Sequence, residues 1–370
     1  MPQAFDITDV LLSFLKIAIV LTAVLSVTPV WVWIERRGGG LIQDRPGPNR
    51  VGPFGLLQAI ADALKFILKE DVIPARAHKW LYTLAPTFGL LPALTTIAVV
   101  PWGRPFVIPE MSVLGQTLFE GGRLFEPIVA NVSVGILVIF ALTSLGVYGI
   151  TTAGWASGSK YPFMGAVRAS AQMISYELAL TLAAISVLMV AGSLRLTEVV
   201  FRQTGYFVLF GIDWLKIPAW NAFSPGMLLA FVVFVVAAFA ETNRLPFDFA
   251  EAEAELVAGY HTEYSSMKFA LFFMAEYMSM GTMSAIIVTL FLGGWDIPWY
   301  NEPATFLGFV LSALFFLIKV SAMMFIFVWV RWTLPRLKYD LLMRLGWKVF
   351  LPLAILNIVI VAAFIAAGWI

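Results

Sequence analysis

Long apolar stretches recur along the whole of this chain of 370 residues. Eight of them can be drawn, and each is long enough to cross a hydrocarbon core of about 30 Å as a helix. They lie near residues 10–34, 80–100, 128–153, 173–193, 222–242, 269–292, 304–330 and 347–369. Lipid offers the backbone no hydrogen-bond partner, so the stretches must be helical. Together with a mean hydropathy of +0.87, the pattern predicts an all-α polytopic membrane protein with about eight transmembrane helices, in a single membrane domain over residues 1–370.

Lys and Arg are distributed unevenly between the two sides that these spans define. The connections after the first, third, fifth and seventh spans carry 17 of the 24 Lys and Arg residues, and the opposite connections carry five. Positive charge is retained on the cytoplasmic side of membranes. We therefore expect both termini to be periplasmic. The expected cytoplasmic connections are residues 35–79, 154–172, 243–268 and 331–346.

Three features of the composition argue against whole classes of function. The chain has no cysteine, so it can form no disulfide, no thiolate-held iron–sulfur cluster and no Cys-based zinc site. Its two histidines, His78 and His261, lie in polar connections, which argues against a bis-histidine haem in the bilayer. A net charge of +1 gives no reason to expect nucleic-acid binding. We expect no metal and no redox cofactor on this chain itself.

Residues 240–268, between the fifth and sixth spans, are unusually acidic. Six of the 23 Asp and Glu residues fall within this stretch. They are Glu241, Asp248, Glu251, Glu253, Glu255 and Glu263. The three alternating glutamates could simply keep a cytoplasmic loop soluble. Such a density of charge beside a membrane also suits a partner surface, or a site whose charge changes.

The first cytoplasmic connection combines an irregular start with an amphipathic end. Its prolines and glycines before residue 54 predict irregular backbone. From Leu57 to Leu68, apolar residues recur at helical spacing, with Gln58 and Asp62 on the opposite, polar face. The segment is too short and too polar to span, so it predicts a helix in the membrane interface. From the pattern alone, this helix is either a surface anchor or part of a functional site.

Four charged residues, Glu177, Glu241, Glu276 and Lys319, lie in or at the ends of spans. An acid at the centre of a membrane helix costs about 2.5–3.5 kcal/mol on insertion scales, so each must be protonated, paired or hydrated. One such acid could merely hold helices together. Three acids beside the acidic stretch favour a path for protons or for a change in charge. Arg244, three residues after Glu241, is expected to contact it on a continuing helix.

Three motifs carry a resemblance to a known family. The acidic stretch contains Glu-Thr-Asn-Arg-x-Pro-Phe-Asp, followed by Glu-x-Glu-x-Glu-Leu-Val-x-Gly-Tyr-His-Thr-Glu-Tyr-Ser. The connection after the first span contains Arg-x-Gly-Pro-Asn-x-x-Gly-x-x-Gly-Leu-Leu-Gln. The connection after the third span contains Gly-Trp-Ala-Ser-x-Ser-Lys-Tyr. In these motifs, and in the number and order of its spans, the chain resembles the quinone-site membrane subunit (H type) of respiratory complex I, the proton-pumping NADH:quinone oxidoreductase. It departs from that pattern at Gly38-Gly39-Gly40 and at Ala59.

The resemblance implies a role for each group of charged residues, while no residue of this chain is expected to be catalytic by itself. The chain would form the membrane-side wall and lipid entrance of a chamber for its substrate, quinone. The implied chamber residues are Arg36, Gln58, Asp62, Asp248, Glu251, Glu253, Glu255 and Arg331. The implied proton or charge relay is Glu177, Glu241, Arg244 and Glu276.

The resemblance also implies partners and a location. NADH, FMN and the iron–sulfur clusters would be bound only by partner subunits. The partners would be the quinone-site subunits of the peripheral arm and the adjacent small membrane subunits. The chain would be integral to an energy-transducing membrane, the cytoplasmic (inner) membrane of a bacterium.

Two alternatives use the same buried acids. A related subunit of membrane-bound hydrogenases does not use quinone, and the full Arg-x-Gly-Pro-Asn and Glu-x-Glu-x-Glu motifs favour complex I over it. An ion-coupled secondary transporter usually has internal repeats and helices broken at mid-span. Neither feature is clear in this sequence, and the long charged connections instead favour docking to a soluble partner.

Overall fold

The computed structural model describes residues 7–108, 111–113, 116–119, 123–208, 216–249, 257–300 and 303–368. In this part of the chain, seven helices are long and apolar enough to cross a membrane, and an eighth apolar helix is shorter. The long helices are α1 (Ile7–Ile42), α3 (Lys79–Thr96), α4 (Gly135–Ala156), α5 (Lys160–Ala191), α9 (Ser266–Phe291), α10 (Phe306–Thr333) and a C-terminal helix made of α11 (Tyr339–Leu345), the π-helical turn Gly346–Phe350 and α12 (Leu351–Ala366). The short helix is α7 (Met227–Glu241). The prediction of an all-α polytopic membrane protein is confirmed.

Short elements connect these helices. The helix predicted in the membrane interface is α2 (Gln58–Leu68), and none of its residues is buried, so its apolar face is available to lipid. The remaining helical pieces are η1 (Pro53–Gly55), η2 (Ile97–Val99), α6 (Leu196–Arg202), η4 (Asn221–Phe223) and η5 (Gly259–His261). Three small antiparallel pairs of strands complete the described chain. They are β1 (Phe106–Ile108) with β4 (Arg123–Phe125), β2 (Met111–Val113) with β3 (Gln116–Phe119), and β5 (Tyr206–Val208) with β6 (Lys216–Pro218).

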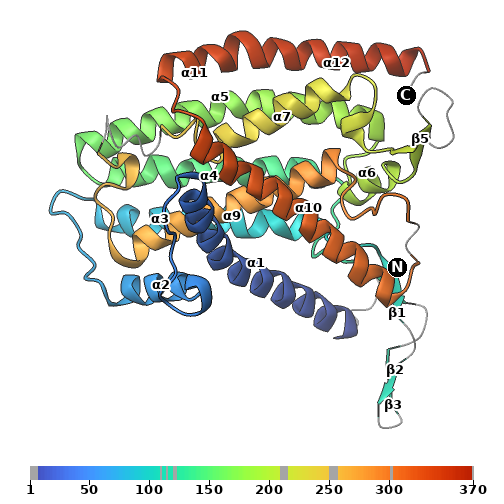
Figure 1. The fold of residues 1–370 in the computed structure, drawn as a ribbon, viewed down its shortest axis with the longest axis horizontal. Helices are drawn as coiled ribbons and strands as arrows, with labels where there is room; N and C mark the ends of the chain where they lie inside the picture. Colours follow the sequence, from blue (N-terminus) through green and yellow to red (C-terminus); the bar gives the residue numbers. More distant parts are fainter. Residues whose placement is uncertain are drawn as a thin grey trace.

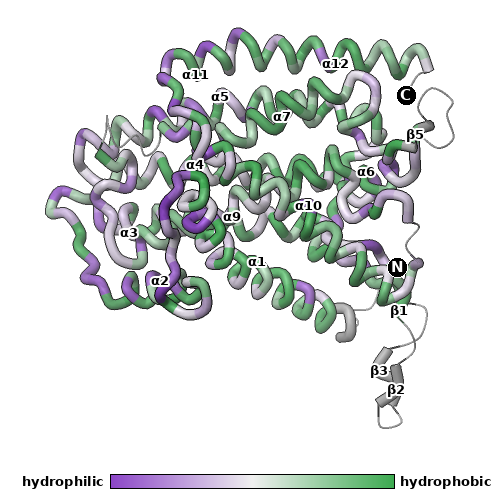
Figure 2. The backbone as a smooth tube through the Cα atoms, in the orientation of Figure 1, coloured by the Kyte–Doolittle hydropathy of each residue, from purple (hydrophilic) through white to green (hydrophobic). Residues whose placement is uncertain are grey.

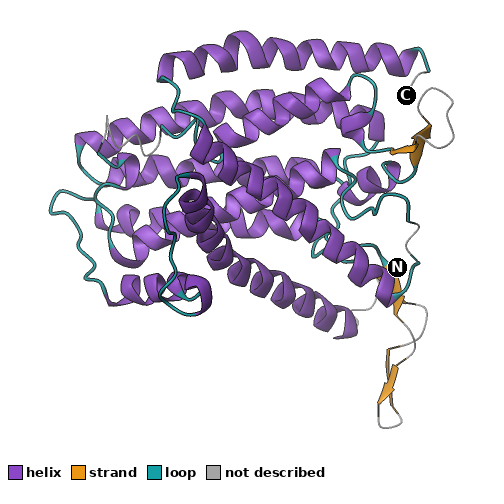
Figure 3. Ribbon diagram, in the orientation of Figure 1, coloured by secondary structure: helices purple, strands orange, loops and turns teal. Residues whose placement is uncertain are grey.

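The helices form a bundle with two different ends. Both termini lie on the side of strands β1 and β5, and α2 lies at the opposite end (Figure 1). Strands are confined to the first of these ends (Figure 3). Hydrophilic residues gather at the end that holds α2, while the helices between the two ends are mainly apolar (Figure 2). This division matches a chain that crosses a membrane and carries a polar surface on one side of it.

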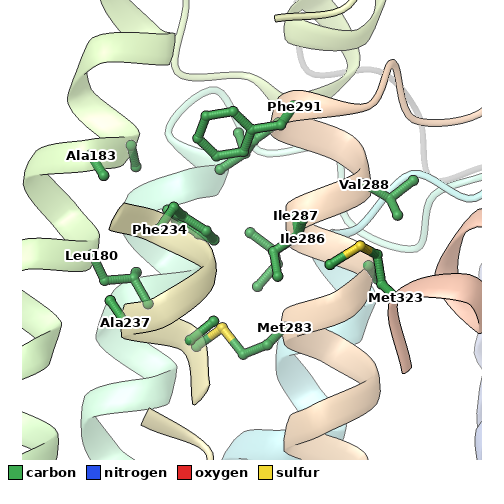
Figure 4. Close-up of a cluster of buried hydrophobic side chains, with 14 of the residues drawn as sticks. Leu180, Ala183, Phe234, Ala237, Met283, Ile286, Ile287, Val288, Phe291 and Met323 are labelled. Atoms are coloured by element: carbon green, nitrogen blue, oxygen red, sulfur yellow. The ribbon is translucent and has the colours of Figure 1, made fainter. Parts of the chain in front are cut away.

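Helix α9 is the centre of the bundle, and α1 stands at its edge. In its most apolar window 67% of α9 is buried, against 0% for α1. Figure 4 shows how the packing is achieved, with Phe234 of α7 and Phe291 of α9 beside the small residue Ala183 of α5. In lipid, close packing of this kind, helped by small residues, holds helices together. The centre therefore gives α9 a fixed position from which its charged residues project.

Several helices are longer than the sequence predicted, and α1 and α5 differ most. Helix α1 continues through three glycines to Ile42, where irregular backbone was expected. A side chain at Gly39 would come within 2.5 Å of the ring of Trp332 in α10, so glycine allows a close helix contact that offsets its poor helix propensity of about 1 kcal/mol. Helix α5 begins at Lys160, and most of the connection expected over 154–172 is helical. The polar residue Gln172 within it is fully buried in protein.

Candidate functional site

Four charged residues from four separate elements meet near the end of the bundle that holds α2. Glu35 comes from α1, Arg244 from the turn after α7, Glu276 from α9 and Arg331 from α10. The Arg244 Nη1 atom lies 3.1 Å from Glu35 Oε1, and its Nε atom lies 2.8 Å from Glu276 Oε1. Arg331 donates a short hydrogen bond to Glu35. We call these four residues the ion cluster.

The ion cluster is balanced in charge, and its centre is shielded from solvent, while Glu276 and Arg331 are partly exposed, at 17% and 23%. Arg244 and Glu35 are 2% and 3% exposed, so the two carboxylates and the two guanidinium groups must compensate one another. Burial lowers the pKa of Arg244, but Glu276 and Glu35 raise it by more, and the guanidinium stays protonated. The ring of Tyr277 lies 4.5 Å from this guanidinium, which adds a cation–π contact.

The structure corrects the partner expected for Arg244. Helix α7 ends at Glu241, so Arg244 lies in the following turn and not one helical turn along from Glu241. It contacts Glu35 and Glu276 instead. Sequence reasoning did not select Glu35 or Tyr277 for this site. The available signal was the position of Glu35, an acid at the predicted end of the first span.

Glu241 and Glu276 line one cavity. It has a volume of about 90 Å³ and lies between α3, α4, α9 and the turn after α7. Its other polar lining comes from hydroxyl and amide side chains, among them Thr143, Asn243 and Thr282. A water molecule needs roughly 10–15 Å³ of such space, so the cavity has room for several. We call it the relay cavity.

The three intramembrane acids have different surroundings. Both carboxyl oxygens of Glu241 are buried, and they form no hydrogen bond to any residue that the structure describes. Glu177 on α5 accepts a short hydrogen bond from Ser144 on α4, and it is close enough to Glu241 for their charges to interact. Glu276 belongs both to the relay cavity and to the ion cluster. The structure therefore brings together the four residues predicted as a relay.

The residues predicted for the quinone chamber fall into separate contacts. Arg36 forms a close ion pair with Asp62, to which Gln58 donates a hydrogen bond of 3.0 Å. These contacts join the end of α1 to α2. Arg336 donates a hydrogen bond of 3.0 Å to Asp248. The predicted residues Glu251, Glu253 and Glu255 lie outside the residues that the structure describes.

The other end of α2 is held by the start of α9. The Ser266 hydroxyl donates a hydrogen bond of 2.9 Å to the carbonyl oxygen of Phe66. The Ser265 hydroxyl donates one of 3.0 Å to the carbonyl oxygen of Glu70, and Lys268 lies 2.9 Å from Asp71. Helix α2 is therefore attached at one end to α1 and at the other to α9.

An apolar cavity of about 130 Å³ lies between α1, α9 and α10. Its lining includes Val27 and Trp31 of α1, Met278 of α9 and Phe316 of α10. Tyr277, which contacts Arg244, is also part of this lining. The cavity and the ion cluster therefore share Tyr277 as a neighbour.

Comparison with known proteins gives one consistent family. A family model described as NADH dehydrogenase matches residues 15–362. The chain is 46% identical over 356 residues to an H-type NADH-quinone oxidoreductase subunit of Koribacter versatilis, covering 96% of this chain and 97% of the relative. It is 48% identical over 363 residues to the H-type NADH-quinone oxidoreductase subunit of Deinococcus radiodurans, covering 97% of this chain and 84% of the relative.

Proposed function

Because the chain belongs to the NADH dehydrogenase family and is a membrane subunit of the complex I type, we propose that it forms the membrane-side wall and lipid entrance of the quinone chamber. In this proposal it also couples quinone reduction to proton translocation through its buried acids. The observation that carries the proposal is the position of Glu276. This one carboxylate joins the ion cluster, through Arg244, to the relay cavity that Glu241 lines.

The apolar cavity supports the entrance. Quinones of respiratory membranes are apolar molecules that reach a protein from the lipid phase, and α1 is the long apolar helix whose most apolar window has the smallest buried share, 0%. The cavity between α1, α9 and α10 is lined in part by Tyr277, whose ring contacts the Arg244 guanidinium. Helix α2, whose apolar side chains are exposed, lies across the same end of the bundle (Figure 1).

The coupling step follows from the shared carboxylate. Reduction of quinone takes up protons and changes the charge of groups in the chamber, such as Asp248 beside Arg336. Arg244 and Glu35, at the centre of the ion cluster, are buried, so a change in charge near them is poorly screened by solvent. Glu276 responds through Arg244, Glu241 takes up the change across the relay cavity, and Glu177, whose charge interacts with that of Glu241, passes it inward.

Other parts of the proposal concern partners. Electrons reach quinone from an iron–sulfur cluster in the peripheral arm, which docks at the end of the bundle with α2. NADH and FMN are bound further out in that arm, and small membrane subunits continue the path from Glu177 and Glu241. The concentration of Lys and Arg at the docking end supports termini on the periplasmic side of the inner membrane.

The test is Glu241→Gln in the assembled complex. Glutamine keeps the size of the side chain but holds it neutral, so quinone reductase activity and proton pumping should fall together by about tenfold or more. Glu241→Asp should retain more activity than Glu241→Gln. NADH oxidation by an artificial electron acceptor, which bypasses the chamber, should persist. Glu198→Gln is the matched control, because Glu198 is exposed and lies on α6 at the other end of the bundle.

A Glu241→Gln complex that assembles and pumps at the wild-type rate contradicts the relay. In that case Glu241 is structural, and the path from quinone to the membrane arm must begin elsewhere. Loss of the artificial-acceptor activity in the same variant would instead mean that the complex had not assembled.

A further inference from the structure

One buried amide holds both ends of the turn that links the two halves of the candidate site. The side chain of Gln172 on α5 is 0% exposed. Its Nε2 atom donates hydrogen bonds of 2.8 Å to the carbonyl oxygen of Ala240 and of 2.8 Å to that of Phe247. Both partners can only accept, so the orientation of the amide is fixed by chemistry.

The segment between these two carbonyls carries the residues of the site. It begins in the last turn of α7 and includes Glu241, which lines the relay cavity, and Arg244, which centres the ion cluster. The backbone N–H of Arg244 bonds to Phe239 O at 3.2 Å, and that of Phe247 bonds to Arg244 O at 2.9 Å. We call residues 240–247 the relay turn.

The Gln172 amide satisfies acceptors of the relay turn while its own oxygen atom stays without a hydrogen-bond donor among the described residues. The carbonyl of Ala240 is one of the last in α7, where partners within the helix run out, and the backbone N–H of Asn243 reaches it only at 3.4 Å. Gln172 adds a shorter hydrogen bond, of 2.8 Å, from another helix. The second amide atom of Gln172, Oε1, is buried and accepts no hydrogen bond from the residues that the structure describes. A polar group left unsatisfied in this way is uncommon in a protein core.

We propose that Gln172 is a positioning residue for coupling. By bonding both ends of the relay turn, it fixes the distance between Arg244 in the ion cluster and Glu241 in the relay cavity. A change in charge at the cluster then reaches Glu241 with a defined geometry. This role rests on the proposed function, since it matters only if Glu241 takes part in coupling.

The first variant is Gln172→Met, which keeps the length and flexibility of the side chain but removes both donors. Hydrogen–deuterium exchange of the whole complex, read on peptides that cover residues 239–249, should be faster than in the wild type. The kcat of quinone reduction should fall by about tenfold, while KM for a short-chain quinone should change by less than about twofold. NADH oxidation by the artificial acceptor should be unchanged.

The second variant, Gln172→Glu, makes the same contact depend on pH. A protonated carboxyl can donate to one of the two carbonyls, whereas an ionised one can only accept and is repelled by both. Its activity relative to the wild type should therefore rise as the pH falls. The charged groups in or beside the relay turn are Glu241, Arg244, Glu177, Asp248 and Arg336. They are present in both proteins, so a pH dependence of the ratio comes from the carboxyl at position 172, directly or through its effect on these groups. This variant carries the test if Gln172→Met does not assemble.

The matched control is Ser170→Ala. Ser170 also lies on α5, but its hydroxyl bonds within the helix, to Ala166 O at 2.7 Å. This change should alter neither the exchange of the relay turn nor the activity. A similar effect from Ser170→Ala would mean that any small disturbance of α5 speeds exchange of the relay turn and lowers activity. That result would overturn a specific role for Gln172.

The outcomes separate this inference from the proposed function. Unchanged exchange of the relay turn in Gln172→Met, or faster exchange with wild-type kcat, overturns the positioning role. If Gln172→Met is slow, the double variant Gln172→Met/Glu241→Gln should be no slower than Glu241→Gln alone, because both changes act at one step. Wild-type activity of Glu241→Gln refutes the proposed function by itself, and faster exchange in Gln172→Met would still support Gln172 as the residue that holds the turn.

Discussion

Replacing Arg244 by methionine should strongly destabilise the protein. The guanidinium is 2% exposed and lies against two carboxylates, Glu35 and Glu276. Removal of one partner from a buried ion pair costs about 3–5 kcal/mol, because a charge is left uncompensated. Folded proteins are stable by only about 5–15 kcal/mol. We therefore expect much less assembled complex in membranes, and a clearly lower Tm for the complex that can be purified.

The origin of this cost can be tested with a second change. Glu35 keeps Arg331 when Arg244 is removed, whereas Glu276 loses its arginine. Adding Glu276→Gln to Arg244→Met removes that excess negative charge. The double variant should therefore be more stable than Arg244→Met alone, by roughly 0.5–3 kcal/mol. Activity need not return, since both changes alter the proposed relay.

The assay is the artificial-acceptor activity per milligram of membrane, which reports assembled complex, together with the Tm of the purified complex. Arg195→Met is the matched control. Arg195 is 40% exposed and pairs with Glu198 on the surface, where an ion pair contributes about 0.2–1 kcal/mol. A double variant that is no more stable than Arg244→Met would refute charge imbalance as the cause, and would point to lost packing around Tyr277.

Two further predictions separate function from stability. The Arg36–Asp62 pair is partly exposed, at 49% and 25%, and contributes about 0.2–1 kcal/mol to stability. Arg36→Ala or Asp62→Asn should therefore leave assembly intact and slow quinone turnover. An equal loss of artificial-acceptor activity would contradict this prediction. Lys319→Met should impair assembly. The Lys319 Nζ atom donates hydrogen bonds to Leu292 O, Gly294 O and Asp296 O at 2.7, 3.1 and 2.8 Å, and each buried acceptor left without a partner costs about 1–3 kcal/mol. A wild-type Tm would show that the lysine is dispensable for stability.

The spans and α2 were predictable because their signal is local. A run of apolar residues, or an apolar stripe at helical spacing, is visible within a single segment. Transfer of that segment into the membrane or onto the membrane surface depends on its own residues. The ends of helices were harder to predict. The glycines of α1 favour irregular backbone in isolation, whereas the close approach of Gly39 to Trp332, far away in the sequence, favours the helix.

The candidate site was predicted in its residue types but not in its pairing. The acids of the relay stood out because charge in a membrane span is costly. The partner of Arg244 could not be found from sequence, because Glu35 is separated from it by 209 positions. On a continuing helix, a spacing of three residues would place Arg244 beside Glu241. Helix α7 ends at Glu241, so this spacing does not apply.

The C-terminal end of α9 limits how the site can work. Three carbonyl groups there are held by buried side chains, since Gln203 bonds to Thr289 O, Asn221 to Leu290 O and Lys319 to Leu292 O. A helix fixed in this way at one end, and packed over most of its length, cannot slide without breaking several hydrogen bonds at once. Glu276 therefore stays at a fixed depth. In the coupling that we propose, a change at the quinone end therefore reaches Glu241 through side chains and the relay turn, and the proposed anchoring of that turn by Gln172 matters for this reason.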